Sequence, residues 1–174
     1  MTGRRDAVET VEGLAELLSA QAGLARRSQL RRLGVTAAHI ADHVAALRWR
    51  QVAPEVISAD NGRLDAEQLR WRAVLHAPMG WLGGRSALEH LGLRGHPPEL
   101  VHILVPMGNR PRPLPGVRIH VTTRTPEQDT PAPGSLRTCP APRACVDAAA
   151  WERHPRAAAG VVLAVVQQRL AGPD

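Results

Sequence analysis

Six arginines lie between positions 26 and 50 and give this stretch the chemistry of a phosphate-binding surface. They are Arg26, Arg27, Arg31, Arg32, Arg48 and Arg50. The only acid among them is Asp42. A guanidinium group holds phosphate oxygens through paired, charge-assisted hydrogen bonds. The stretch therefore favours contact with a nucleic-acid backbone, and a solvated basic face is the simpler alternative.

Two histidines in the same stretch, His39 and His43, are four residues apart and share one face of a helix. Metal ligands often have this spacing, but Ile40 stands where the zincin motif has Glu, and no third ligand is apparent. We therefore expect no metal and no cofactor. We expect both rings to turn away from Ile40 and Val44, toward a surface that could face a DNA groove. The residues of that surface are Thr36, Ala38, His39 and His43.

Hydrophobic spacing and turn residues predict the elements that position these side chains. Apolar residues repeat at helical spacing over 11–22, and two further helices are expected at 27–33 and 37–47. Residues 49–58 are typical of strands, and a tight turn is expected at 60–62. This order of helix, helix–turn–helix and β-wing predicts a winged helix-turn-helix domain.

The helix expected at 37–47 is the one that would enter the groove. Thr36 is a good N-cap for it. Ile40, Val44 and Leu47 make its expected buried stripe. In a winged helix-turn-helix, the neighbouring elements contact phosphates while this helix lies in the major groove. The arginines on either side of it fit that role.

The fold class that we expect is α+β, with the winged helix-turn-helix over 1–60 and a mixed α+β domain over 61–174. The elements expected in the second domain are helices at 65–77 and 86–91, strands at 100–106 and 117–122, and helices at 143–151 and 157–170. A loop rich in Arg and Pro joins the two strands. Arg110, Arg112 and Arg118 could extend a DNA-binding track, but we favour an ordinary polar hairpin.

The composition is that of a globular protein with an anionic partner. The chain has 174 residues, 44% of them hydrophobic and 22% charged, and a formal charge of +6. A pI near 11.2 favours nucleic acid as that partner. Residues 1–10 lack the apolar region of a signal peptide, so a cytoplasmic protein is expected. All the aromatic residues are tryptophans, which we expect to anchor the core: Trp49, Trp71, Trp81 and Trp151.

Several classes of catalysis are excluded by residue type. All 22 basic residues are Arg, so the chain lacks the Lys of a Walker A loop, of Schiff-base enzymes and of nucleases with a catalytic Glu-x-Lys. It also lacks the Gly-x-Ser-x-Gly motif of many hydrolases. Cys139 and Cys145 have the wrong spacing for a zinc knuckle, and we expect free thiols. We do not expect an enzyme.

Three motifs in order resemble the N-terminal winged helix of AbiEi-family proteins, the antitoxins of type IV toxin–antitoxin pairs. They are Gly23–Leu30, Leu33–Thr36 and Leu47–Pro54. Four further motifs in the second segment follow the same family order. They are Gly84–Leu88, Val101–Pro106, Leu114–His120 and Pro142–Ala149. The resemblance covers the chain from about Leu17 to Asp147.

The resemblance implies a regulator that binds operator DNA and represses its own operon, without direct contact with the toxin. Many family members carry a further C-terminal nuclease-like domain, and we expect that this chain stops before it, at Gly172–Asp174. Two features depart from the family. The wing reads Pro54-Glu55-Val56-Ile57 in place of Pro-Gly-Val-Tyr, and the third helix shows Ala38, His39, Asp42 and His43 where the family often has Arg. A protein-interaction scaffold that no longer binds DNA is the alternative.

Overall fold

The computed structural model describes residues 11–126 and 134–171 and has a mixed α+β architecture in two compact units. The described part of the first unit runs to His76 and includes Gly134 and Ser135. The remaining residues from Ala77 onward form the second unit. The first unit therefore includes the helix at 66–76 as well as the segment before it. The expectations for residues 1–10 and for the end at Gly172–Asp174 lie outside the described residues.

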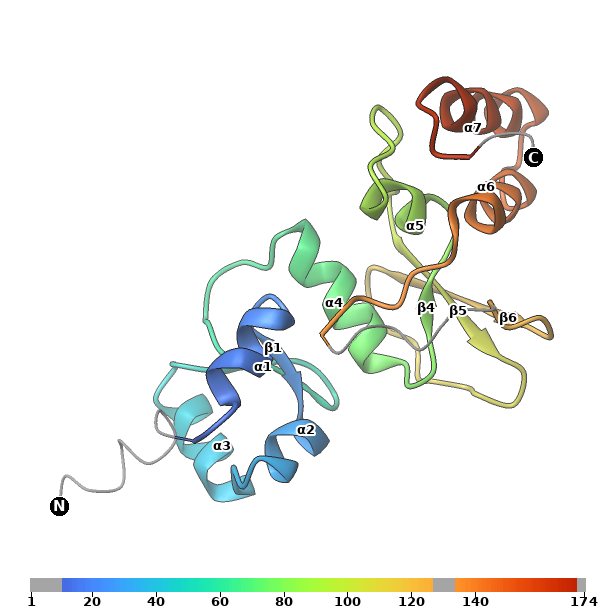
Figure 1. Ribbon diagram of the computed structural model, residues 1–174. Helices are drawn as coiled ribbons and strands as arrows, with labels where there is room; N and C mark the ends of the chain where they lie inside the picture. Colours follow the sequence, from blue (N-terminus) through green and yellow to red (C-terminus); the bar gives the residue numbers. More distant parts are fainter. Residues whose placement is uncertain (1–10, 127–133, 172–174) are drawn as a thin grey trace, which may run out of the picture. The chain divides into compact units, whose positions relative to one another are not determined.

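The first unit wraps helices around a small antiparallel sheet (Figure 1). Its elements are α1 (Leu14–Ala20), β1 (Leu24–Arg26), α2 (Arg27–Arg32), α3 (Ala37–Ala45), β2 (Arg50–Ala53), β3 (Val56–Ser58) and α4 (Ala66–His76). The strand order is β1-β3-β2, with Ala25 opposite Ile57 and Gln51 opposite Ile57 on the other side. Leu30, Val35 and Ile40 pack against this sheet in a common core.

Helix α3 begins where the sequence predicts and ends earlier. The N-cap prediction is confirmed, because the Oγ1 atom of Thr36 accepts a hydrogen bond from the backbone N–H of His39 at 3.2 Å. The helix stops at Ala45, and Leu47 has a left-handed backbone with φ of 55°. The prediction that Leu47 is buried is wrong, since its side chain is 70% exposed. Trp49 takes the buried position instead.

The hairpin turn of this sheet lies at Pro54-Glu55, because Ala53 pairs with Val56 across it. The turn predicted at Asp60-Asn61-Gly62 lies after β3 and leads toward α4. There the backbone N–H of Gly62 donates to the carboxylate of Asp60. The prediction also missed β1, whose three residues are too few for a periodic pattern.

The second unit is built on a mixed three-stranded sheet with helices beside it (Figure 1). Its elements are β4 (Trp81–Leu82), α5 (Gly84–His90), β5 (Val101–Pro106), β6 (Val117–Thr122), α6 (Ala141–Ala150) and α7 (Pro155–Gln167). The strand order is β4-β5-β6. Helix α5 packs on β5 and on α6, and α7 packs on α6.

The two long strands of this unit are parallel, with Val101 opposite Val117 and Pro106 opposite Thr122. The prediction that this segment forms a hairpin is therefore wrong, because the strands of a hairpin are antiparallel. A hairpin joins its strands with two to five residues, whereas residues 107–116 connect these strands over a longer path. The alternating prolines at 111, 113 and 115 suit an extended connection back to the start of β6.

Tryptophans fill much of the two cores. Trp49, Trp71 and Trp81 are at most 8% exposed, which confirms their predicted role, while Trp151 is only partly buried. Cys139 and Cys145 are buried free thiols, as predicted. Across the described residues, the structure contains no helix with the length and apolar character needed to cross a membrane.

Candidate nucleic-acid interface

Five of the ten predicted contact residues are exposed on the first unit. Arg31 and Arg32 occupy the last turn of α2, and Arg48 lies in the connection from α3 to β2. Thr36 and Ala38 are exposed at the start of α3. The structure therefore places three exposed guanidinium groups on the elements that precede and follow α3, as the sequence suggested.

Arg27 is partly buried and links α2 to the β2–β3 hairpin. Its backbone N–H donates to the carbonyl of Glu55 at 2.9 Å, and its Nη2 atom donates to Oε1 of Gln51 at 3.1 Å. The Nε2 atom of Gln51 in turn donates to the carbonyl of Pro54 at 3.0 Å. Arg27 thus fixes the hairpin turn against α2. Sequence reasoning missed Gln51, because nothing in a strand pattern marks a side chain that bonds across to a helix.

Arg26 and Arg50 are also partly buried. The backbone N–H of Arg26 donates to Oε1 of Gln29 at 2.8 Å, which stabilises the first turn of α2. The Nε atom of Arg26 is buried and has no hydrogen-bond partner among the described residues. Arg50 donates from Nη2 to the carbonyl of Gly62 at 2.5 Å. Both guanidinium groups are therefore less available for phosphate than those of Arg31 and Arg32.

The two histidines of α3 do not share an outer surface. His39 is partly exposed, but His43 is 6% exposed and its ring stacks on Trp49 at a centroid distance of 4.5 Å. The prediction that His43 faces the groove is therefore corrected. The reason is helical geometry, because His43 lies three residues after the buried Ile40 and so falls on the same face.

Acidic side chains interrupt the basic surface at two places. Asp42 is exposed on α3, and Glu55 is exposed in the hairpin turn. A phosphate backbone passing close to either carboxylate would be repelled. Arg31, Arg32 and Arg48 are the exposed arginines among the predicted contact residues and are the ones most available to an anion.

The second unit contains a cluster of rings that the sequence did not indicate. His102 on β5 and His120 on β6 are joined by a hydrogen bond between Nδ1 and Nε2 at 3.1 Å. The ring of His120 stacks on Trp151 at a centroid distance of 3.4 Å with an interplanar angle of 6°. The pKa of His120 is lowered to about 4, mainly by burial and to a smaller extent by repulsion from a positive charge on His102. Burial likewise lowers the pKa of His102. The cluster is therefore held in its neutral state.

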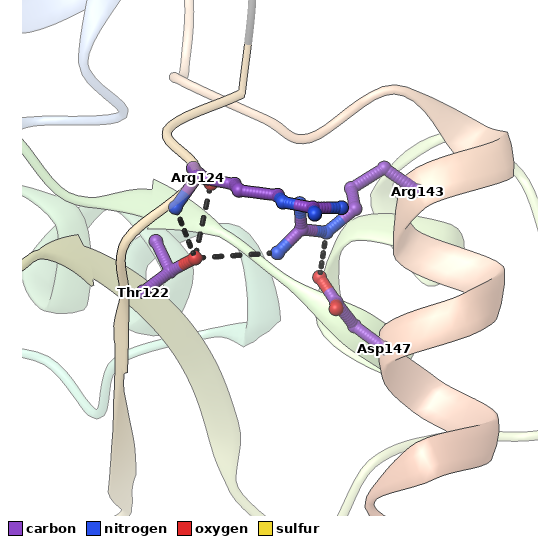
Figure 2. A network of polar contacts seen from close by, with 4 residues as sticks. All are labelled: Thr122, Arg124, Arg143 and Asp147. Atoms are coloured by element: carbon purple, nitrogen blue, oxygen red, sulfur yellow. Dashed lines mark hydrogen bonds and ion pairs between the residues drawn. The ribbon is translucent and has the colours of Figure 1, made fainter.

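The two acids near the C-terminal helices are both paired with arginines. Arg143 donates from Nε to the carboxylate of Asp147 at 2.8 Å and from Nη2 to Oγ1 of Thr122 at 3.4 Å. Figure 2 shows these contacts. The same hydroxyl accepts the backbone N–H of Arg124 at 3.1 Å. This network ties α6 to the end of β6. Glu152 pairs with Arg85 at 2.6 Å. Both carboxylates thus have structural partners.

The remaining candidates from the sequence are three arginines of the second unit, the buried cysteines and possible metal ligands. Arg110, Arg112 and Arg118 are exposed on the second unit. Burial raises the pKa of the Cys139 thiol to about 12, so it stays protonated and unreactive. Within the described ranges, no group of three or more His, Cys, Asp or Glu side chains could hold a metal ion.

The sequence matches none of the protein-family models with which it was compared, and no curated protein matches it. The function of this surface is therefore argued from its geometry and charge.

Proposed function

We propose that this protein is a DNA-binding transcriptional regulator whose first unit is a winged helix-turn-helix. The support is the order of its elements, α1-β1-α2-α3-β2-β3, with the strands arranged β1-β3-β2. Helices α2 and α3 are separated by a short turn, 33–36, as in a helix-turn-helix. In this arrangement α3 enters the major groove and the β2–β3 hairpin is the wing.

The observation that carries the proposal is the placement of three exposed arginines around α3. Arg31 and Arg32 precede the helix and Arg48 follows it. Arginines in these places contact phosphates and so position a recognition helix without reading sequence. Ala38 and His39 then lie on the part of α3 that faces base edges. The resemblance to AbiEi antitoxins extends the proposal to autorepression of a toxin–antitoxin operon.

A salt titration of DNA binding tests the phosphate contacts. Fluorescence anisotropy is measured for the full chain on the DNA upstream of its gene and on a random duplex. Replacing Arg31 and Arg32 together by Ala should lower the log–log salt slope by about 1.8, because each phosphate contact contributes about 0.9. The affinity loss should be similar on both duplexes. The matched control is the double change Arg94→Ala and Arg156→Ala, which removes the same charge from exposed positions in the second unit.

Base reading and repression are tested separately. His39→Ala should reduce the preference for the upstream duplex by about 1–3 kcal/mol if the ring contacts a base edge. A reporter gene placed behind the upstream DNA should be repressed by the wild-type protein and released by the Arg31/Arg32 double variant. A reporter that is unaffected by the wild-type protein would remove the autorepressor part of the proposal.

Asp42 and Glu55 favour a second candidate, a protein-interaction scaffold on the same fold. Both carboxylates are exposed where DNA would approach. A scaffold predicts weak binding to DNA with the same affinity and salt slope for the wild type and the Arg31/Arg32 double variant. Changing Asp42 to Asn discriminates further, because it should strengthen DNA binding in the regulator and leave a scaffold's DNA affinity unchanged.

A further inference from the structure

The sheet of the second unit has one covered edge and one open edge. At the first edge, a later segment of the chain lies along β4. There the backbone N–H of Leu82 donates to the carbonyl of Arg137 at 2.8 Å, and the N–H of Cys139 donates to the carbonyl of Leu82 at 2.9 Å. At the other edge is β6, the last strand in the order β4-β5-β6 (Figure 1). In the described part of the chain, no strand pairs with the outer side of β6, which is therefore the open edge.

The register of β6 on β5 shows which of its backbone groups face the open edge. The carbonyls of Gly116 and Thr122 both accept backbone N–H groups from the β5 side at 2.9 Å. The parallel pairing between these two bonds has no irregularity. Backbone groups alternate in direction along a strand, so the even-numbered residues of β6 bond to β5. Ile119 and Val121 therefore direct their N–H and C=O groups toward the open edge.

An edge of this kind is a template for the backbone of another strand. Proteins commonly protect such edges with very short strands, prolines, bulges or charged side chains. β6 has six residues, contains no proline and pairs with β5 without a bulge. The one protective feature on the strand itself is the charge of Arg118. A partner that can neutralise this charge could therefore add a strand here and gain backbone hydrogen bonds.

The side chains of β6 alternate between the two faces of the sheet and determine what an added strand must carry. On one face, Val121 is 58% exposed and Ile119 is partly buried. On the other face, Arg118 is exposed, whereas His120 stacks on Trp151. The side chains of a paired strand lie beside these in the same alternation. An added strand thus fits best when its apolar residues alternate with acidic ones.

The sign of the charge around β6 selects the kind of partner. Residues 108–126 contain no acid and four exposed arginines, Arg110, Arg112, Arg118 and Arg124. A second copy of this chain would bring the same arginines to the edge and would be repelled by them. Nucleic acid has the opposite charge but lacks the backbone N–H and C=O groups that pair with a strand. An acidic peptide in extended conformation has both properties.

We propose that the open edge of β6 binds an extended acidic segment of a partner protein, which adds a fourth strand to the sheet. The backbone groups of Ile119 and Val121 pair with the segment. Its apolar side chains pack against Val121, and Arg118 binds its carboxylates. The inference concerns the second unit and does not depend on DNA binding by the first.

A fluorescent peptide tests this edge directly. The probe is a peptide of about ten residues with alternating Val and Glu, which is long enough to span β6. It is titrated with the full chain, and binding is followed by fluorescence anisotropy. Three matched peptides are compared: one has all Val before all Glu, one has Lys in place of Glu, and one is N-methylated at its four central residues, so that neither side can donate to the sheet. The alternating Val/Glu peptide should bind about tenfold or more tightly than each of them.

Variants of the protein test the same edge. Val121→Pro removes an N–H that points outward, and an edge strand tolerates proline at such a position. It should weaken binding of the Val/Glu peptide about tenfold or more. Val121→Thr keeps the N–H and should bind almost as tightly as the wild type. Arg118→Gln should weaken binding about two- to fivefold and reduce its dependence on salt. Arg156→Gln, at an exposed position on α7, is the matched control for the loss of charge.

Four outcomes would overturn the proposal. The first is that the Val/Glu peptide does not bind at submillimolar protein concentration. The second is that N-methylation leaves its affinity unchanged, a test that holds even if Val121→Pro fails to fold. The third is that sedimentation shows a wild-type dimer which Val121→Pro dissociates, while the peptide does not bind; the partner would then be a second copy. The fourth is that the peptide does not bind and Arg118→Gln lowers the salt slope of DNA binding by about 0.9, which would assign this edge to nucleic acid. DNA binding by the first unit is judged separately, from the Arg31/Arg32 double variant.

Discussion

Replacing Gly84 by Ala should strongly destabilise the second unit. Gly84 is the first residue of α5 and has φ of 51°, a left-handed backbone that side chains disfavour. A Cβ atom at this position would lie 2.4 Å from Cζ3 of Trp151 and 2.8 Å from Cε3. The indole cannot retreat freely, because His120 stacks closely on it.

The expected size of the effect follows from these two costs. The left-handed conformation costs a residue with a Cβ atom about 1–2 kcal/mol. Forcing an additional methyl group into a packed site typically costs about 1–3 kcal/mol. Gly84→Ala should therefore lower the free energy of unfolding by about 2–5 kcal/mol. That is a large part of the stability of a typical domain, which is about 5–15 kcal/mol.

Equilibrium urea unfolding, followed by circular dichroism, measures the loss against two matched controls. Gly108→Ala has the backbone cost alone, since φ is 92° and nothing lies within 4 Å of the added Cβ atom. It should lose about 1–2 kcal/mol. Gly160→Ala, inside α7 with open space around it, should gain about 0.5–1 kcal/mol. The reasoning is refuted if Gly84→Ala loses no more stability than Gly108→Ala. Combining Gly84→Ala with Trp151→Leu should recover part of the loss, because the overlap is removed.

Three further changes follow from contacts described above. The pKa of His120 is about 4 in the folded protein and 6.5 in the unfolded chain. The contribution of its neutral ring to stability is therefore fully present above pH 6.5 and is lost as the pH falls toward 4. After allowance for solvent screening this loss is about 1–2 kcal/mol, and thermal melts of His120→Gln should show a flatter pH profile. Thr36→Ala should remove the N-cap of α3 and cost about 1 kcal/mol in urea unfolding; Thr125→Ala, outside any helix, is a control. Cys139 should not react with a thiol reagent at pH 8 until the protein is unfolded, and fast labelling of the native protein would contradict its burial.

The sequence predicted the helices and long strands well because their patterns extend over several residues. The predicted strand at 117–122 has the bounds of β6, and the predicted start of α3 is exact. Where the pattern was short or ambiguous, the prediction failed. The three residues of β1 show no periodicity. The parallel pairing of β5 with β6 could not be read either, since an alternating strand looks the same for a parallel or an antiparallel neighbour.

The candidate site was predicted in part for a similar reason. The density of positive charge correctly indicated that Arg31, Arg32 and Arg48 are exposed, but it could not show that Arg26, Arg27 and Arg50 are partly buried. The spacing of four residues from His39 predicted an outward His43, but the spacing of three residues from the buried Ile40 places His43 on the buried face. Sites that combine distant residues gave no signal in the sequence. The stacked rings of His102, His120 and Trp151 in the second unit are brought together only by the fold.

The parallel pairing of β5 and β6 also limits how the length of the chain can change between them. A six-residue strand spans about 20 Å at 3.3 Å per residue, and the segment 107–116 must return over that distance. A Pro-rich segment extends by about 3.1 Å per residue, so only a few of its residues are spare. Insertions near Gly108 can be accommodated at little cost, whereas deletion of more than about four residues would leave the chain too short to reach Val117. A reporter tag is therefore best inserted in this loop. A shortened variant of the protein should keep the full length of the segment 107–116.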